Sequence, residues 1–252
     1  MRVGLKVDIV WFPEGAEEAA KTGNLLIVVD NFRCSSFMST ALWLGAKAIH
    51  PIASVEEAFK LARSLENTIL AGEVDAVKVQ GFDLGNSPTS LLSLNVKDKV
   101  IVLRTSAGTQ VIDSIRKNRV YDIKVFIGCL LNARTVAVLS EQLARVSSKN
   151  VTIVCSGRGG MSFALEDYIA AGAIINHCSS DVELTDSALG SLMAFKGASN
   201  VGLLKILKET ESAKRLFEIG AGSDFEYCSQ LNKQSIVPML FGQVIKNYTE
   251  EN

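Results

Sequence analysis

The chain has 252 residues, of which 48% are apolar and 21% are charged. This length suits one large domain or two closely packed ones, and this composition excludes a disordered tail, a collagen and a small disulfide-stapled scaffold. Because 26 basic residues face 27 acidic ones, the net charge is −1, and no overall field draws the chain to nucleic acid or to an anionic membrane. Any anion-binding site must therefore be local.

Cysteine usage and the start of the chain bear on its compartment. The five cysteines are odd in number and lack CxxC spacing, which fits neither a disulfide framework nor a zinc ribbon. Residues Met1 to Asp8 carry charges and no apolar signal-peptide segment, and no apolar stretch approaches the ~20 residues of a membrane span. We therefore expect a reducing, cytoplasmic setting and no membrane partner.

Short runs rich in β-branched residues predict strands. Several of them, such as the Leu-Leu-Ile-Val-Val run that begins at Leu25, are apolar without alternation, which is typical of strands covered on both faces. The predicted strands are, in chain order, Leu25–Asp30, Ala46–Ile52, Thr68–Gly72, Val100–Thr105, Lys124–Cys129 and Val151–Ser156.

Segments with helical periodicity lie between these strands. In Val55–Leu65 the apolar residues form one stripe, Ser54 is the expected N-cap, and Glu57 completes a capping box. Further helices are predicted over Gln110–Lys117, Leu131–Val146 and Glu166–Asn176. The alternation of strand and helix predicts an α/β fold, layered α/β/α around a largely parallel or mixed sheet.

The pattern changes after about Asp181, where helical segments follow one another and a short strand is predicted near Ser235–Leu240. We therefore expect a sheet core at 1–180 that carries the site, and a helix-rich C-terminal portion at 181–252 packed on it, either within one domain or as a second unit. The helical segments are Thr185–Phe195, Val201–Leu207, Ser212–Ile219 and Phe225–Asn232.

Polar residues gather where the predicted strands end, which is where ligands bind in open α/β sheets. Asp30 follows the first of these strands, and its side chain suits either a helix N-cap or a metal ligand or attacking carboxylate. Glu73 follows another strand and is either a solvated loop acid or part of a site. Neither an Asp-x-Asp phosphatase signature nor a Walker loop accompanies them.

Three segments suit an oxyanion. Arg33 could bind phosphate or carboxylate in a bidentate manner, or simply pair with Asp30. The Thr105–Thr109 turn precedes a helix, so its N–H groups could cradle an anion, or its hydroxyls could serve only as caps. The glycines of Gly157–Gly160 surround Arg158 and permit close backbone approach to an oxyanion.

The remaining candidates are acids and amides in loops. Glu166 and Asp167 begin a predicted helix, where negative charge is favourable even without a function. The loop at 81–88 holds Asp83, Asn86 and Ser87 and could be only a tight turn.

Chemistry by histidine or zinc is not favoured, because His50 and His177 lie in or beside apolar segments. Carboxylates are hard ligands that suit Mg²⁺, whereas arginines and helix starts suit oxyanions. Their combination indicates a phosphate ester held by Mg²⁺.

Six sequence blocks, in this order, resemble the 2-phosphosulfolactate phosphatase family. The resemblance covers residues 25 to 190 or so, and implies a Mg²⁺-dependent acid phosphatase that hydrolyses (2R)-2-phospho-3-sulfolactate to 3-sulfolactate and phosphate in coenzyme M biosynthesis. The blocks are Val-Val-Asp-Asn-Phe-Arg-Cys-Ser-Ser at 28–36, Leu-Ala-Gly-Glu at 70–73, Gly-Phe-Asp-Leu-Gly-Asn-Ser-Pro at 81–88, Thr-Ser-Ala-Gly-Thr at 105–109, Gly-Cys-Leu-Leu-Asn-Ala at 128–133, and Ser-Gly-Arg-Gly-Gly-Met-Ser-Phe-Ala-Leu-Glu-Asp at 156–167.

Together with the residue chemistry above, the resemblance implies roles for particular positions. The expected catalytic residues are Asp30, Arg33, Glu73 and Asp83. The expected substrate and phosphate ligands are Asn86, Ser87, Thr105, Ser106, Gly108, Thr109, Arg158 and Ser162. The expected Mg²⁺ ligands are Asp30, Glu73, Glu166 and Asp167.

The chain departs from the family's pattern at Asn31, Phe32 and Cys34 after the first acid, and at Val74 and Ala107. These departures leave a second hypothesis open, in which the chain is a non-catalytic or substrate-drifted relative that binds an anionic metabolite. The expected partner in either case is a small anionic phospho acid, not nucleic acid, and the apolar content would suit a homodimer.

Overall fold

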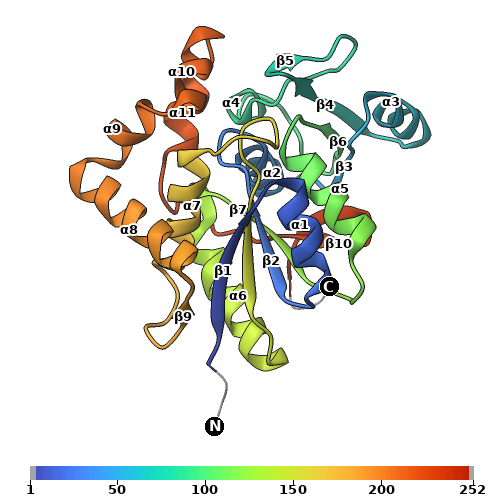
Figure 1. Cartoon of the computed structure of the whole chain (residues 1–252). Coiled ribbons are helices and arrows are strands. Elements are labelled where there is room, and N and C mark those ends of the chain that lie inside the picture. The colour runs from blue at the N-terminus through green and yellow to red at the C-terminus, as the bar shows by residue number, and fades with distance from the viewer. Residues whose placement is uncertain (1–3, 250–252) are drawn as a thin grey trace.

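The computed structural model describes residues 4–249, and within them one mixed sheet of 11 strands forms the centre of the molecule (Figure 1). Its spatial order is β5-β4-β6-β3-β11-β10-β7-β2-β8-β1-β9. The strands are β1 (Lys6–Trp11), β2 (Leu25–Val29), β3 (Ala48–Pro51), β4 (Thr68–Val74), β5 (Val77–Lys78), β6 (Val100–Arg104), β7 (Val125–Gly128), β8 (Val151–Cys155), β9 (Glu183–Leu184), β10 (Pro238–Phe241) and β11 (Val244–Asn247).

Helices cover both faces of this sheet (Figure 1). They are α1 (Phe12–Lys21), α2 (Cys34–Trp43), α3 (Val55–Ser64), α4 (Pro88–Leu91), α5 (Gly108–Asn118), α6 (Ala133–Ser147), α7 (Leu165–Ile175), α8 (Asp186–Val201), α9 (Leu203–Lys208), α10 (Glu211–Glu218) and α11 (Gly222–Cys228), with one 3₁₀ turn at Leu130–Asn132. None of the helices within residues 4–249 is long and apolar enough to cross a membrane.

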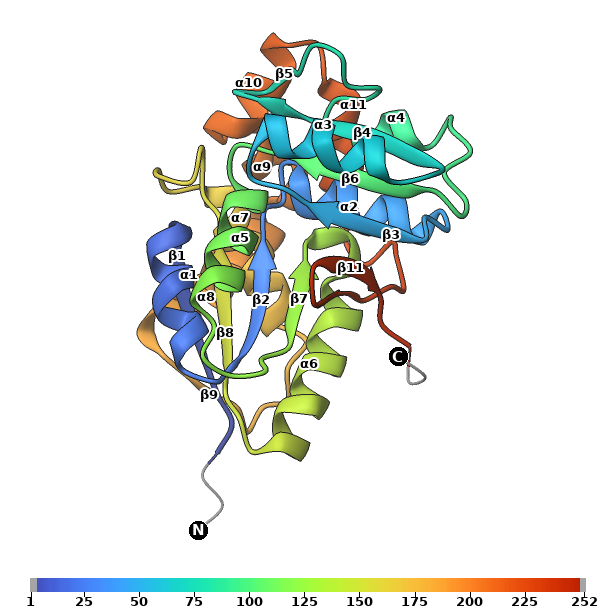
Figure 2. The same ribbon diagram turned by 90° about the vertical axis from the view of Figure 1, so that its right-hand side faces the viewer.

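The sheet consists of two parallel groups joined by an antiparallel hairpin. Strands β7, β2, β8, β1 and β9 pair in parallel, and so do β3, β6 and β4. The β10–β11 hairpin pairs antiparallel with β7 on one side and with β3 on the other. Figure 2 shows β3, β4 and β6 crossing above β2 and β7, so that residues following strands of both groups come together.

Burial on β2 explains why its sequence lacks alternation. Leu25, Ile27 and Val29 pack on one face with α6, α7 and α8, whereas Leu26 and Val28 pack on the other with α1, α2 and α5. All five side chains are buried. The layered α/β/α fold with a mixed sheet is thus confirmed, and the six predicted strands correspond to β2, β3, β4, β6, β7 and β8.

Some elements differ from the sequence prediction. The helices α1 and α2 and the strand β1 were not expected, and the single strand expected near Ser235–Leu240 is one arm of the β10–β11 hairpin. The helices α8 to α11 confirm a helix-rich C-terminal portion. The expected boundary near residue 180 stays a prediction, because the chain beyond it also supplies strands β9, β10 and β11 of the shared sheet.

Candidate active site

A cavity of about 550 Å³ lies beyond the carboxyl ends of β2, β4, β6 and β8, and α10 forms part of its wall. Its charged lining combines acids and arginines that follow strands with acids and cations of helix α10. The lining carboxylates are Asp30, Glu73, Asp75, Glu166, Asp167, Glu211 and Glu218, and the lining cations are Arg33, Arg158, Lys214 and Arg215.

Asp30 is a buried carboxylate held by two backbone N–H groups. Its Oδ2 accepts a hydrogen bond from the N–H of Gly108 at 2.9 Å, and its Oδ1 accepts one from the N–H of Cys34 at 3.2 Å. A Cβ atom at position 108 would lie 2.9 Å from Asp30 Oδ2 and 2.7 Å from Cys34 Sγ, so the contact requires glycine there. Burial, reinforced by the charges of Glu73 and Glu166, raises the pKa of Asp30 to about 7 despite the two N–H donors.

Glu73 joins the end of β4 to the turn after β6. Its Oε1 accepts a hydrogen bond from the N–H of Ser106 at 2.7 Å, and its Oε2 accepts others from Ser106 Oγ at 3.1 Å and from the N–H of Ala76 at 2.6 Å. Arg104 donates to the Glu73 carbonyl at 2.6 Å. Both donors of Ser106 are therefore engaged by a carboxylate.

This engagement corrects the expected phosphate turn at Thr105–Thr109. Thr105 and Thr109 are buried, and each accepts the other's N–H on its hydroxyl, at 3.1 and 2.9 Å. The N–H of Gly108 binds Asp30. Of the four residues expected to bind phosphate, only Ser106 lines the cavity, because neighbouring side chains already satisfy the turn's donors.

Glu166 and Asp167 begin α7 and lie at the base of the cavity. Asp167 accepts hydrogen bonds from the N–H of Asn31 at 2.8 Å and of Gly157 at 2.9 Å, which ties the residues after β2 to those after β8. Burial raises the pKa of Asp167, and the charges of Asp30 and Glu166 raise it further. Burial also raises the pKa of Glu166. The backbone N–H of Asn31 therefore helps to link two strand ends, and this link does not depend on the Asn31 side chain.

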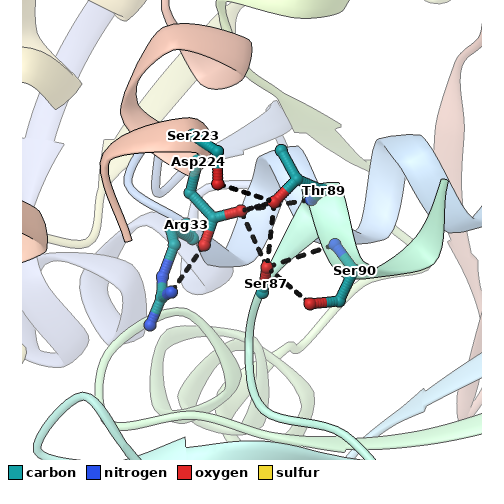
Figure 3. A network of polar contacts seen from close by, with 6 residues as sticks. All are labelled: Arg33, Ser87, Thr89, Ser90, Ser223 and Asp224. Carbon is teal, nitrogen blue, oxygen red and sulfur yellow. Dashed lines mark hydrogen bonds and ion pairs between the residues drawn. The ribbon is translucent and has the colours of Figure 1, made fainter. Parts of the chain in front are cut away.

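Arg33 pairs with Asp224 of α11 and not with Asp30 (Figure 3). The ion pair is 2.7 Å long, and only 8% and 1% of the two side chains are exposed. Sequence reasoning missed Asp224, because it lies in a short helix far from any predicted strand end. It also missed the α10 wall, since six of that helix's eight residues line the cavity without any recognisable motif.

Two polar atoms at the cavity are buried and have no hydrogen-bond partner within residues 4–249. They are Asn86 Oδ1 and Arg158 Nε. Arg158 also pairs with Glu211 of α10 through its Nη1. Unpaired polar atoms in a buried site are uncommon, so these two mark residues of the cavity lining whose hydrogen bonding a polar ligand could complete.

Three further expected residues do not reach the cavity. Asp83 is exposed and accepts the Leu70 N–H at 2.8 Å, so it ties its loop to strand β4 and does not join the buried acids. Ser162 is exposed and contacts Arg158 only through its backbone. Ser87 caps α4 and donates to Asp224 at 2.8 Å.

The carboxylates suit Mg²⁺ by their chemistry but do not form a complete ligand set. Within the described part of the chain, no three His, Cys, Asp or Glu side chains are grouped as a ready-made metal site. The acids are nevertheless close enough for their charges to raise one another's pKa. Proteins bind Mg²⁺ through one or two carboxylates plus substrate phosphate and water, and a pair such as Asp30 and Asp167 would fit that pattern. Both oxygens of Glu73, the other strand-end acid expected to bind the ion, already accept hydrogen bonds from Ser106 and Ala76.

Comparison with known proteins places this geometry in a family. The model of the 2-phosphosulpholactate phosphatase family matches residues 11–243. The chain belongs to this family. The matched range contains all the cavity residues described above, and membership makes the chain a phosphatase, a hydrolase of phosphate esters.

Relatives of this family match along nearly their whole length. A probable 2-phosphosulfolactate phosphatase of Pseudothermotoga lettingae is 37% identical over 92% of this chain and 95% of its own. Proteins with the same name from Clostridium tetani and Clostridium beijerinckii are 34% and 31% identical, covering 96% and 93% of this chain and 100% and 96% of their own. The family resemblance expected from the sequence blocks is confirmed.

Proposed function

We propose that the chain hydrolyses (2R)-2-phospho-3-sulfolactate to 3-sulfolactate and phosphate, with Mg²⁺, as a step of coenzyme M biosynthesis. The observation that carries this proposal is the meeting of buried carboxylates and arginines in one cavity, in a member of this phosphatase family. The names of the Pseudothermotoga and Clostridium relatives support the sulfonated substrate.

The charge of the cavity supports a divalent cation. Seven carboxylates and four cationic side chains line it, whereas the proposed substrate brings a phosphate, a carboxylate and a sulfonate. Mg²⁺ on Asp30 and Asp167, with Glu166 beside them, would offset this repulsion and polarise the phosphoryl oxygens. The N–H groups of Gly108 and Asn31 keep these carboxylates in orientation, as outer hydrogen bonds do around metal ligands.

The cations of the cavity serve the substrate's anions. Arg33 and Arg158 line it and present forked N–H donors that match the geometry of phosphate, carboxylate and sulfonate oxygens. Asn86 adds a buried amide beside them. These side chains orient the phosphate ester and stabilise negative charge while its P–O bond breaks.

Phosphate release from a panel of 2-phospho acids, with and without a sulfonate, tests the proposal. We expect turnover that EDTA abolishes and Mg²⁺ restores, with the highest kcat/KM for the sulfonated compound. Turnover that is independent of metal would contradict the cation. Equal rates for sulfonated and unsulfonated acids would contradict the substrate, and saturable binding without phosphate release would favour the anion-binding hypothesis.

A further inference from the structure

The buried contact between Arg33 and Asp224 connects three segments that are distant in the sequence (Figure 3). We infer that Asp224 is a positioning residue, which acts on the substrate through Arg33 by holding its guanidinium toward the cavity. Testing this role by turnover depends on the proposed function, whereas the role itself is inferred from the hydrogen bonds of Asp224.

The two oxygens of Asp224 have different partners. Oδ2 accepts the hydrogen bond from Arg33 Nη1 at 2.7 Å. Oδ1 accepts from Ser87 Oγ at 2.8 Å, from Thr89 Oγ1 at 2.6 Å and from the N–H of Thr89 at 3.1 Å. The start of α4 thereby fixes the carboxylate, and the carboxylate fixes the guanidinium. One oxygen serves as the anchor and the other as the orienting contact.

Charge in the cavity explains why such an anchor is needed. Arg33 lies on the same cavity as Asp30, Glu73 and Glu166, which are unbalanced carboxylates in a buried setting. An unanchored guanidinium would be drawn onto these acids and would cancel the charge that binds metal or substrate. Pairing with Asp224, which lies buried outside the cavity lining, satisfies Nη1 and leaves the other donors of the fork for an incoming anion.

The burial of the pair favours a positioning role over a purely stabilising one. Both side chains are nearly inaccessible, and desolvating two charges costs about as much as their attraction returns. A pair of apolar residues would stabilise this contact between α11 and the start of α2 at least as well. A charged pair is useful at this position because Arg33 also lines the cavity and offers it hydrogen-bond donors.

A double-variant cycle tests the inference, with Arg33→Gln, Asp224→Asn and the double variant. Two readouts are measured, which are kcat/KM for (2R)-2-phospho-3-sulfolactate and calorimetric binding of inorganic phosphate and of 3-sulfolactate. We expect Asp224→Asn to lower kcat/KM by about 10- to 100-fold, mainly through KM, and the double variant to be no worse than Arg33→Gln alone. Binding of at least one of the two anions follows the same non-additive pattern.

Thr89→Val is the matched control, because it removes a hydrogen bond to Oδ1 and leaves Oδ2 facing Arg33. Ser87 Oγ and the N–H of Thr89 still hold Oδ1 in this variant, so we expect a lower melting temperature and a loss of kcat/KM well below that of Asp224→Asn. If Asp224→Asn does not fold, Asp224→Glu takes its place in the cycle, since the longer side chain keeps the charge but shifts the oxygen that faces Arg33. An unchanged kcat/KM in Asp224→Glu would then count against the inference.

Additive losses in the cycle would overturn the inference, and so would a loss in Thr89→Val equal to that in Asp224→Asn. Anion binding that ignores both Arg33 and Asp224 would also overturn it. Failure of the proposed function can be distinguished from failure of this inference. If the parent hydrolyses no sulfonated ester but the losses of phosphate binding in the cycle are non-additive, only the proposed substrate is refuted.

Discussion

At the scale of single residues, the carboxyl of Asp30 combines a raised pKa with two fixed hydrogen bonds. Such a group is costly to keep charged in a buried site, and the acids around it add to that cost. A cation or a phosphoryl group that enters the cavity therefore relieves a repulsion already present in the fold. Asp30 is thus prepared for a ligand before one arrives.

Asp30→Asn is expected to separate activity from stability. We expect kcat to fall by about 10²- to 10³-fold or more, since an amide supplies neither the charge nor the ligand strength of a carboxylate. The melting temperature should hold or rise, because the neutral side chain removes the repulsion with Glu73 and Glu166. Steady-state kinetics and a melting curve measure both, and full activity would remove Asp30 from the site.

Gly108→Ala tests the close approach of the backbone to Asp30. The added methyl would clash with Cys34 Sγ and Asp30 Oδ2, so we expect a loss of about 1–3 kcal/mol in the free energy of unfolding together with reduced kcat. Gly197→Ala in α8 is the control, since nothing lies within 4 Å of its added Cβ and alanine should stabilise that helix by about 0.5–1 kcal/mol. Urea unfolding compares the two variants, and equal stabilities would contradict the clash.

The residues around the site also show where sequence reasoning reaches its limit. Residue types at strand ends suggested one site for Asp30, Glu73, Glu166 and Asp167, and all four line the cavity, whereas their roles stay predictions. Residue types do not show which N–H and O–H groups of the chain would donate hydrogen bonds to these acids. Charge-assisted hydrogen bonds are stronger than neutral ones, so Glu73 takes both donors of Ser106 before any ligand can.

At the scale of elements, the sequence reveals a strand or helix only when its pattern of burial is regular. Helix α3 was predicted, over Val55–Leu65, because one face is apolar and Ser54 is a suitable N-cap, and in the structure Ser54 Oγ accepts the N–H of Glu57. Helix α2 gives no such signal, because every residue from Cys34 to Leu42 is buried and no polar stripe remains. Strand β1 passes directly into α1, so no turn separates them in the sequence.

Glu141→Gln in α6 is expected to give a pH-dependent loss of stability. Burial pushes the pKa of Glu141 up, but hydrogen bonds from Ser179 and Arg145 outweigh it and hold the pKa below the ordinary 4.5. A depressed acid stabilises the fold above its unfolded pKa and loses that contribution as pH falls through the folded one. We therefore expect a deficit of about 1 kcal/mol at neutral pH that shrinks at pH values below 4.5.

The control for this change is Glu17→Gln in α1, which removes a similarly spaced contact to Lys21 that is largely exposed. Its effect on the free energy of unfolding should stay below about 0.5 kcal/mol at every pH. Urea titrations across the acid range measure both variants. A deficit in Glu141→Gln that does not change with pH would mean that packing, not charge, supplies the contribution of this side chain.

At the scale of the whole molecule, the C-terminal hairpin holds the two parallel groups of strands together. Composition indicated helices after Asp181, and these exist, but nothing local in Pro238–Asn247 reveals that this segment pairs with β7 and β3. Such long-range pairing is decided by which strand edges are left open by the rest of the chain. The sequence therefore predicts the layers and the cavity's acidic base, and not the order of all the strands.

Ending the chain at residue 234 is expected to prevent folding. The truncation would remove Met239, Leu240 and Ile245 from the core and would leave the facing edges of β7 and β3 unpaired. We expect aggregation in size-exclusion chromatography and no cooperative transition by circular dichroism. A monomer that melts cooperatively would show that each parallel group is stable on its own.

The pairing of Arg33 with Asp224 spans 191 positions along the chain. Translation must therefore have passed residue 224 before the guanidinium can meet its partner, and residue 247 before the hairpin can close the sheet. The anchored guanidinium is a late feature of folding, because it needs a segment that is translated long after its own.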